Sequence, residues 1–170
     1  MDIDFVNKTY TPADEKDLWQ TPQGLYDALD KEFNFQLDCC ADSSNTFHRN
    51  YFSESFSFLD NPPNHFGEIR AAFINPPYSK TSLFLDKVAS DAIDYNITFV
   101  AIVNANTDTK WFADAVKSAN EVRLFTGRIS FIKPDGKKAS GNPKGQCLII
   151  WRGNCKTPCQ ITMINRDDLI

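Results

Sequence analysis

The feature that most constrains the fold of this chain is a regular alternation between short apolar runs and amphipathic segments. Apolar residues recur at helical spacing in residues 21–33, 80–94 and 108–119. Apolar runs typical of strands occupy residues 35–41, 71–75, 97–103, 121–132 and 146–151. Because strands joined through helices pair in parallel, the alternation predicts an α/β fold with a mainly parallel sheet and helices on both faces. The last two strands have no helix between them, which predicts an antiparallel hairpin at the sheet edge.

Two of the predicted helices carry further local signals. Leu25, Leu29 and Phe33 share one face of the first helix. Thr21 is its predicted N-cap, and Pro22 occupies its first helical position. The apolar face of the second helix is formed by Leu83, Phe84, Val88 and Ile93. Residues 42–68 carry no clear helical or strand pattern.

Length and composition favour one cytoplasmic domain. The 170 residues suit a single domain (1–170), with an N-terminal arm at 1–16 and a basic loop at 133–146. The apolar runs are too short to span a membrane, and the acidic, polar start argues against a signal peptide. Five irregularly spaced cysteines then favour reduced thiols. The net charge of −4 excludes non-specific coating of nucleic acid, yet it permits a local basic patch.

The stretch FINPPYSK (73–80) ends a predicted strand in a rigid polar corner. Proline fixes its own φ, has no N–H to donate, and keeps the preceding residue out of the helical region. Asn75, Pro76 and Pro77 are therefore predicted to form a stiff extended turn with free carbonyl oxygens. An ordinary turn needs neither two prolines nor an aromatic residue directly after them. Ligands of open α/β sheets bind beyond the carboxyl ends of strands, where this corner and the loop LDCCADSSN (37–45) both fall.

Five segments in a fixed order carry a resemblance to a known family: DLWQTPQGLYDAL, FQLDCCADSSN, FINPPYSK, NTDTKWF and GRISF. Together they resemble the phage-type DNA N-6-adenine-methyltransferase (Dam) family over roughly residues 17–151. The resemblance implies a Rossmann-like methyltransferase domain, with S-adenosylmethionine as the small-molecule methyl donor and DNA as the partner. It also implies transfer to N6 of adenine by a phage-encoded enzyme, protecting DNA from host restriction in the bacterial cytoplasm.

Other functions stay open at this point. The same corner is compatible with transfer to N4 of cytosine, to RNA or to a protein glutamine. A catalytically silent relative that binds DNA or a host protein is favoured by one departure from the general methyltransferase pattern. Asp42, Ser43 and Ser44 replace the usual glycines of the cofactor loop. The intact acceptor pair of the corner argues against a silent relative.

The catalytic residues implied by the resemblance are Asn75, Pro76, Pro77 and Tyr78. The amino nitrogen of adenine is a poor nucleophile because its lone pair is delocalised into the ring. Two acceptors, the Asn75 side-chain oxygen and the Pro76 carbonyl, would favour a pyramidal nitrogen as the methyl group arrives, and the prolines hold them in place. A base inside a duplex must be flipped out, and Tyr78 offers it a stacking face.

The resemblance places the cofactor at Trp19, Thr21, Pro22, Asp38, Cys40, Ala41, Asp42 and Asn45. A helix that begins near Thr21 can receive a carboxylate at its N-terminus. Asp38 or Asp42 can meet an ammonium group, although a turn role is the structural alternative for Asp38. No acidic residue for the ribose hydroxyls is obvious, and Glu54 and Asp60 are the candidates.

Contact with DNA requires local positive charge, which the segment IKPDGKKASGNPKG (132–145) supplies. The residues expected to contact DNA are Lys80, Lys110, Trp111, Arg128, Lys133, Lys137, Lys138 and Lys144. Trp111 is expected to line the base pocket, although a tryptophan on a helix more often belongs to the core. Arg123 is expected to extend the basic surface. The segment reads as a mobile loop between strands, and a merely solvated face is the ordinary explanation of such a charge run.

No metal site is expected. Neither the two histidines near Cys39 and Cys40 nor the pair Cys155 and Cys159 has the spacing of a zinc site. Methyl transfer needs no covalent enzyme intermediate, so Cys39 and Cys40 are expected to be small core residues.

Overall fold

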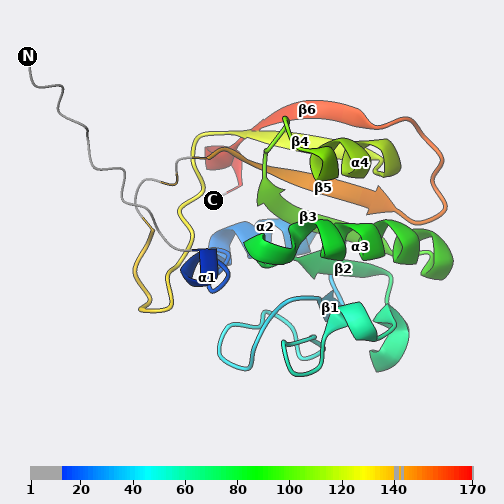
Figure 1. Cartoon of the computed structure of the whole chain (residues 1–170), viewed down its shortest axis with the longest axis horizontal. Helices are drawn as coiled ribbons and strands as arrows, with labels where there is room; N and C mark the ends of the chain where they lie inside the picture. Colours follow the sequence, from blue (N-terminus) through cyan, green and yellow to red (C-terminus); the bar gives the residue numbers. More distant parts are fainter. Residues whose placement is uncertain (1–12, 140–141, 143, 170) are drawn as a thin grey trace, which may run out of the picture.

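The computed structural model describes residues 13–139, 142 and 144–169 as an α/β fold built on a six-stranded sheet (Figure 1). The strands are β1 (Leu37–Asp38), β2 (Ala71–Ile74), β3 (Thr98–Asn104), β4 (Glu121–Thr126), β5 (Gln146–Arg152) and β6 (Gln160–Asn165). The α-helices are α1 (Ala13–Lys16), α2 (Gln23–Phe33), α3 (Thr81–Tyr95) and α4 (Lys110–Ser118). Short 3₁₀ helices are η1 (Phe58–Asp60), η2 (Pro63–Phe66), η3 (Tyr78–Lys80) and η4 (Arg166–Asp168). Within these described ranges, no helix has both the length and the apolar character needed to cross a membrane.

The sheet is mixed, with the strand order β1-β2-β3-β5-β4-β6. β1, β2 and β3 run parallel, β5 is antiparallel to both of its neighbours, and β6 is parallel to β4. The predicted antiparallel pairing of the last two recognised strands is confirmed, but their predicted place at the edge is wrong. The first six residues of β5 are all buried, so this strand lies inside the sheet, between β3 and β4. The edge belongs to β6, which is largely exposed and shows no strand pattern strong enough to predict.

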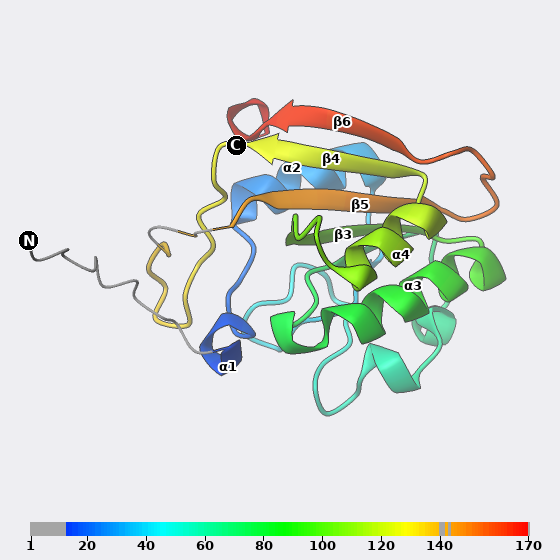
Figure 2. The same cartoon turned by 45° about the horizontal axis from the view of Figure 1, so that its top comes forward.

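Helices cover both faces of the sheet, as predicted (Figure 2). α2 packs on one face, where Leu25, Tyr26 and Leu29 join sheet residues that include Phe73 and Ile150. The other face carries α3 and α4, and its core includes Phe84, Val88, Phe112, Ile149 and Trp151. Successive residues of one strand enter opposite cores because side chains alternate across a pleated sheet.

The helix boundaries correct two predictions. Thr21 is not the N-cap of α2, because Pro22, in extended conformation (φ −60°, ψ 137°), takes that position and the helix begins at Gln23. In α3, the predicted apolar positions Leu83 and Ile93 are 58% and 66% exposed. The buried face of α3 is instead formed by Thr81, Phe84, Leu85, Val88, Asp91 and Ala92.

Two predicted strands are shorter than expected, and irregular or hairpin segments follow them. The strand predicted at 121–132 ends at Thr126, because Gly127 takes a positive φ of 81°. Residues 131–139 then form a small hairpin, in which Ile132 pairs with Lys138. The strand predicted at 35–41 keeps only two strand residues, 37 and 38.

Residues 42–68 are irregular but packed. Tyr51 makes a parallel bridge to Asp38, which places residues 50–52 beside β1. Phe52 lies against Phe58 and Phe66, at ring-centroid distances of 5.7 and 5.2 Å. Aromatic packing therefore holds this segment where the sequence pattern shows no regular element. Of the predicted N-terminal arm, residues 13–16 form α1, and residues 1–12 lie outside the described part.

Candidate active site

A cavity of about 670 Å³ opens at the carboxyl ends of β1 and β2. Six chain segments line it: residues 17–21, 38–47, 52–60, β2 with the corner after it, α3 through Phe84, and the hairpin 131–139 through Pro134. A cavity of this size encloses a cofactor-sized ligand. Its position agrees with the predicted ligand end of the sheet. Five carboxyl side chains line it, against one cationic side chain, Lys80; the acids are Asp17, Asp38, Asp42, Glu54 and Asp60.

The corner places Asn75 in the cavity wall directly after the fully buried strand β2. The side-chain nitrogen of Asn75 donates to the backbone carbonyl of Trp19, at 3.3 Å, and to Oγ1 of Thr21, at 3.2 Å. Both N–H groups of the amide therefore have partners on the protein. The side-chain oxygen keeps its capacity to accept hydrogen bonds from a ligand.

The two proline carbonyls of the corner differ. The Pro77 carbonyl accepts from the Lys80 N–H at 3.0 Å and from the Thr81 hydroxyl at 3.3 Å, so the prediction that it is free is wrong. The Pro76 carbonyl receives no hydrogen bond from the part of the chain that the structure describes. Of the four predicted catalytic residues, Asn75 and Pro77 line the cavity. Pro76 and Tyr78 lie in the same corner outside the lining.

Residues 17–21, here named the strap, cross one side of the cavity and are fastened to two other segments. Asp17 accepts from the backbone N–H and the hydroxyl of Ser79, at 3.0 and 2.5 Å. Gln20 exchanges two backbone hydrogen bonds with Ile132, at 2.8 and 2.9 Å. Figures 1 and 2 both show α1, which leads into the strap, beside the hairpin 131–139. Burial, and secondarily the charge of Asp17, raises the pKa of Tyr78 to about 12.

Asp38 is a buried carboxyl group at the end of β1, and it faces the cavity. Its oxygens accept only two long bonds, from the N–H groups of Cys40 at 3.3 Å and Phe47 at 3.4 Å. Burial raises its pKa to about 7, although these two hydrogen bonds act in the opposite direction. The predicted turn role is therefore present, but it leaves most of the hydrogen-bonding capacity of the group unused.

Asp42 differs from Asp38 because its carboxylate is already engaged. It accepts from the N–H and hydroxyl of Ser44, at 2.7 and 2.5 Å, and from the Asn45 amide at 3.1 Å. These hydrogen bonds close the loop at residues 42–45, where the general methyltransferase pattern has glycines. Of the two acids predicted to meet an ammonium group, Asp38 is thus the better placed.

The other predicted cofactor residues mostly lie where expected. Trp19, Thr21, Cys40, Ala41 and Asn45 line the cavity, and Pro22 does not. Burial raises the pKa of the Cys39 and Cys40 thiols well above their usual range, so both stay protonated at neutral pH. Sequence reasoning did not assign a site role to the apolar lining residues Phe47, Phe52, Phe58 and Leu59.

Asp17, Ser79 and Pro134 are further lining residues that sequence reasoning did not single out. The only local signal for them is their position beside recognised segments. Within the described residues, no cluster of three or more His, Cys, Asp and Glu side chains has the geometry of a metal site.

Several of the predicted DNA contacts lie at the cavity, on the hairpin 131–139, or near Gly145. Lys80 lines the cavity, and Lys133, Lys137 and Lys138 lie on the hairpin whose Pro134 also lines it. Arg128 and Lys144 are exposed near Gly145, toward which the Arg128 guanidinium extends.

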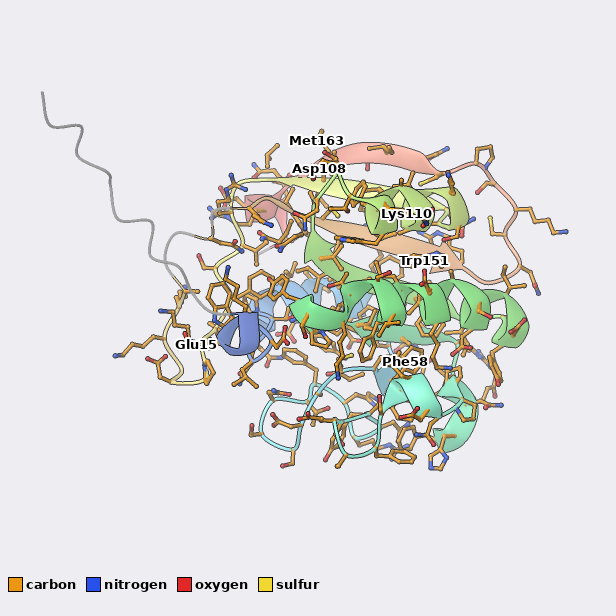
Figure 3. All side chains as sticks on the ribbon, viewed as in Figure 1. Glu15, Phe58, Asp108, Lys110, Trp151 and Met163 are labelled. Atoms are coloured by element: carbon orange, nitrogen blue, oxygen red, sulfur yellow. The ribbon has the colours of Figure 1, made fainter. Side chains whose placement is uncertain are left out.

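The remaining predicted contacts lie elsewhere. Lys110 forms an ion pair with Asp114 at 2.5 Å on α4, well apart from Phe58 beside the cavity (Figure 3). Trp111 packs against Phe112 and the core, outside the cavity lining, so its predicted place in a base pocket at this cavity is not supported. Arg123 pairs with Glu32 and Glu121 and is not part of an open basic surface.

Comparison with known proteins gives a consistent result. The model of the family described as DNA N-6-adenine-methyltransferase (Dam) matches residues 8–170. The chain is 32% identical over 151 residues to the DNA N-6-adenine-methyltransferase of Haemophilus phage HP1, covering 86% of this chain and 85% of the relative. It is 27% identical over 161 residues to the DNA N-6-adenine-methyltransferase of Escherichia phage T1, covering 85% of this chain and 66% of that protein.

Proposed function

The chain belongs to the DNA N-6-adenine-methyltransferase (Dam) family, and we propose that the cavity between the strap and the corner is where it performs the family's reaction. The protein is an adenine-specific DNA methyltransferase, which methylates N6 of adenine in DNA. The assignment to this cavity rests on one observation: Asp38, at the end of β1, and Asn75, directly after the adjacent strand β2, line it together. The mixed sheet with its flanking helices is then a Rossmann-like methyltransferase domain.

The corner supplies the acceptors for the adenine amino group. Neither the side-chain oxygen of Asn75 nor the carbonyl of Pro76 accepts a hydrogen bond from the described residues, so both are available to the base. Hydrogen bonds from the two N6 protons to these oxygens favour the pyramidal nitrogen that attacks the methyl group. Because the prolines hold the oxygens in place, little reorganisation is needed in the transition state. Tyr78 stacks on the base once it has left the duplex.

The cavity suits S-adenosylmethionine, which supplies an electrophilic methyl group on a positively charged sulfur. Five lining carboxyl groups against one lysine match a ligand with an ammonium and a sulfonium group. Asp38 binds the ammonium group, since its carboxylate is the least engaged within the loop after β1. Phe47 and Phe58 provide apolar surface for the purine ring.

Both acids expected from the sequence as partners of the ribose hydroxyls are compatible with this cavity. Glu54 and Asp60 both line the cavity. Glu54 is favoured, because it follows the segment that pairs with β1 at Tyr51.

The hairpin 131–139 and the nearby residues Arg128 and Lys144 form the DNA surface. Lys137 and Lys138 are exposed, and the hairpin is joined to the cavity wall through Gln20 and Pro134. Cations at the mouth of an acidic cavity can hold the phosphates while the base enters. Because both relatives come from phages, the biological role proposed is methylation of phage DNA in the bacterial cytoplasm, which protects it from host restriction.

The decisive experiment is methyl transfer from labelled S-adenosylmethionine to DNA that lacks methylated bases, followed by mass spectrometry of the nucleosides. The wild-type protein is expected to produce N6-methyladenine and no N4-methylcytosine. Asn75→Ala removes one acceptor and should slow turnover by about a hundredfold, the effect of deleting one preorganised polar partner. Its affinity for S-adenosylmethionine should match that of the wild type.

Asn64→Ala, at an exposed amide of η2, is the matched control and should keep wild-type turnover. Full activity of Asn75→Ala would remove the corner from the mechanism. Wild-type protein that forms no methylated nucleoside would instead support the catalytically silent relative.

A further inference from the structure

We propose that Thr21 is a positioning residue, which holds the Asn75 amide with its oxygen, not its nitrogen, toward the adenine amino group. The Trp19 carbonyl selects this orientation because it can only accept, and the Thr21 hydroxyl stabilises it by accepting the second N–H. This inference rests on the proposed function of the corner. The sequence resemblance instead implied that Thr21 contacts the cofactor. The geometry points to Asn75, because the Asn75 nitrogen lies 3.2 Å from the Thr21 hydroxyl oxygen.

A primary amide has two orientations of nearly equal shape, and only one of them serves the reaction. With the oxygen toward the base, the amide accepts an N6 proton; with the nitrogen toward the base, two donors face each other. The Trp19 carbonyl can only accept, so it requires the Asn75 nitrogen on the strap side. The Thr21 hydroxyl takes the second N–H on the same side.

The hydroxyl is itself held in place. Thr21 is 4% exposed, and Pro22, the N-cap of α2, directly follows it. On the other side, the strap is fastened by Gln20 to Ile132 and by Asp17 to Ser79. Because the strap cannot move away without breaking these bonds, the acceptor stays in place before substrate arrives. Preorganisation of this kind acts on the chemical step rather than on ligand binding.

The test compares Thr21→Val, which keeps the shape without the hydroxyl, with Thr21→Ser, which keeps the hydroxyl. Thr21→Val should lower kcat by about tenfold, the effect of losing one buried hydrogen bond. The Kd for S-adenosylmethionine, measured by calorimetry, and the KM for DNA should each stay within about twofold of wild type. Thr21→Ser should have a kcat within about twofold of the wild-type value.

The outcomes separate this inference from the proposed function. If Asn75→Ala turned over at the wild-type rate, the proposed role of the corner would be overturned. If Asn75→Ala turned over slowly while Thr21→Val kept the wild-type kcat, only the positioning role of Thr21 would be overturned. A raised Kd for S-adenosylmethionine with unchanged kcat would make Thr21 a cofactor residue and would also overturn it.

A double variant gives the sharpest reading. In the Asn75→Ala background, Thr21→Val should cause no further loss in single-turnover rate, because the amide that it orients is absent. A further tenfold loss there would mean that Thr21 acts independently of Asn75, against the proposal. Thermal melting checks that each variant is folded, and Thr21→Ala replaces Thr21→Val if the valine disturbs packing.

Discussion

Asp38 is an acid in an unusual position, since it is almost fully buried and yet forms no ion pair with any residue in the described part of the chain. Its ordinary pKa of 3.8 is raised to about 7 by burial. Between these two values, the folded protein keeps a proton that the unfolded chain has released. The contribution of Asp38 to the free energy of unfolding therefore falls as the pH rises from about 4 to about 7, and it levels off above pH 7.

This linkage predicts that Asp38→Asn stabilises the ligand-free protein at pH 8, because asparagine needs no ionisation. The gain should be on the order of 1 to 4 kcal/mol at pH 8 and close to zero at pH 4. Denaturant unfolding at both pH values measures it. Asp86→Asn, at an exposed carboxyl on α3, is the control and should show no such gain. Equal effects of the two variants at pH 8 would contradict the burial argument.

The same residue predicts how cofactor affinity depends on pH. In the proposed site the ammonium group pairs with ionised Asp38, so the affinity for S-adenosylmethionine should rise between about pH 6 and pH 7.5 and then level off. Calorimetry in buffers of different ionisation enthalpy should detect proton release on binding near pH 6.5. Asp38→Asn should bind more weakly and lose this pH dependence. An unchanged profile in the variant would place the ammonium group elsewhere.

At the scale of elements, the hairpin 131–139 joins the proposed DNA surface to the cavity. The sequence suggested a mobile loop, but Ile132 pairs with both Lys138 and Gln20, and Ala139 is buried. The turn is closed at Gly136, which has a φ of 79°. A hairpin held in this way presents lysines at a fixed distance from the cavity.

We predict that Lys137→Ala/Lys138→Ala reduces the salt dependence of DNA binding. Each phosphate contact contributes about −0.9 to the slope of log affinity against log salt, so the slope should flatten by as much as about two units. Binding should weaken equally on all sequences, and the Kd for S-adenosylmethionine should not change. Fluorescence anisotropy across a salt series measures both slopes.

The control for this prediction is Lys117→Ala/Lys156→Ala, which removes the same charge from exposed sites away from the hairpin. If both double variants change the slope equally, the effect reflects net charge, and the hairpin is only a solvated turn.

Elements with strong periodicity were predictable, and their neighbours in the sheet were not. α2 and β3 follow directly from apolar spacing, because local propensity and burial agree there. The edge strand β6 escaped prediction, since it is mostly exposed and pairs only with β4. The place of β5 between β3 and β4 depends on long-range pairing, which its own residues encode only as continuous burial.

The parts of the candidate site also differ in how far the sequence predicts them. The corner at Asn75 and the loop at Asp38 were recognisable, because their residue types are unusual at strand ends. Trp19 and Thr21 of the strap were assigned to the site only through the family resemblance, and the attachment of the strap to the corner was not predictable. Its bonds join residues 54, 56 and 62 positions apart, and no local pattern announces such contacts.

At the scale of the whole molecule, the cavity walls differ in how they are held. The sheet side is fixed by continuous ladders, whereas residues 42–60 depend on aromatic packing and a few turn hydrogen bonds. Backbone amides in such segments exchange through local opening rather than global unfolding.

We therefore predict that S-adenosylmethionine slows hydrogen exchange in residues 38–60 and in the strap. At the proposed site the ligand would contact both walls of the cavity and stabilise the closed form by mass action. Amides of β4, β5 and β6 should exchange at unchanged rates, which serves as the internal control. Protection confined to β4–β6 would place the ligand outside this cavity.

The fastening of the strap also has a consequence for the order in which the molecule acquires its parts. Contacts more than 50 positions apart close late in folding, because the entropy of long loops is lost before the contacts form. The amide of Asn75 can be oriented only after β2 is in place, and the bridge from Gln20 to Ile132 requires the hairpin as well. Regain of methyl transfer should thus lag behind regain of helical circular dichroism during refolding. A folding chain of this protein therefore acquires its helices before it can methylate DNA.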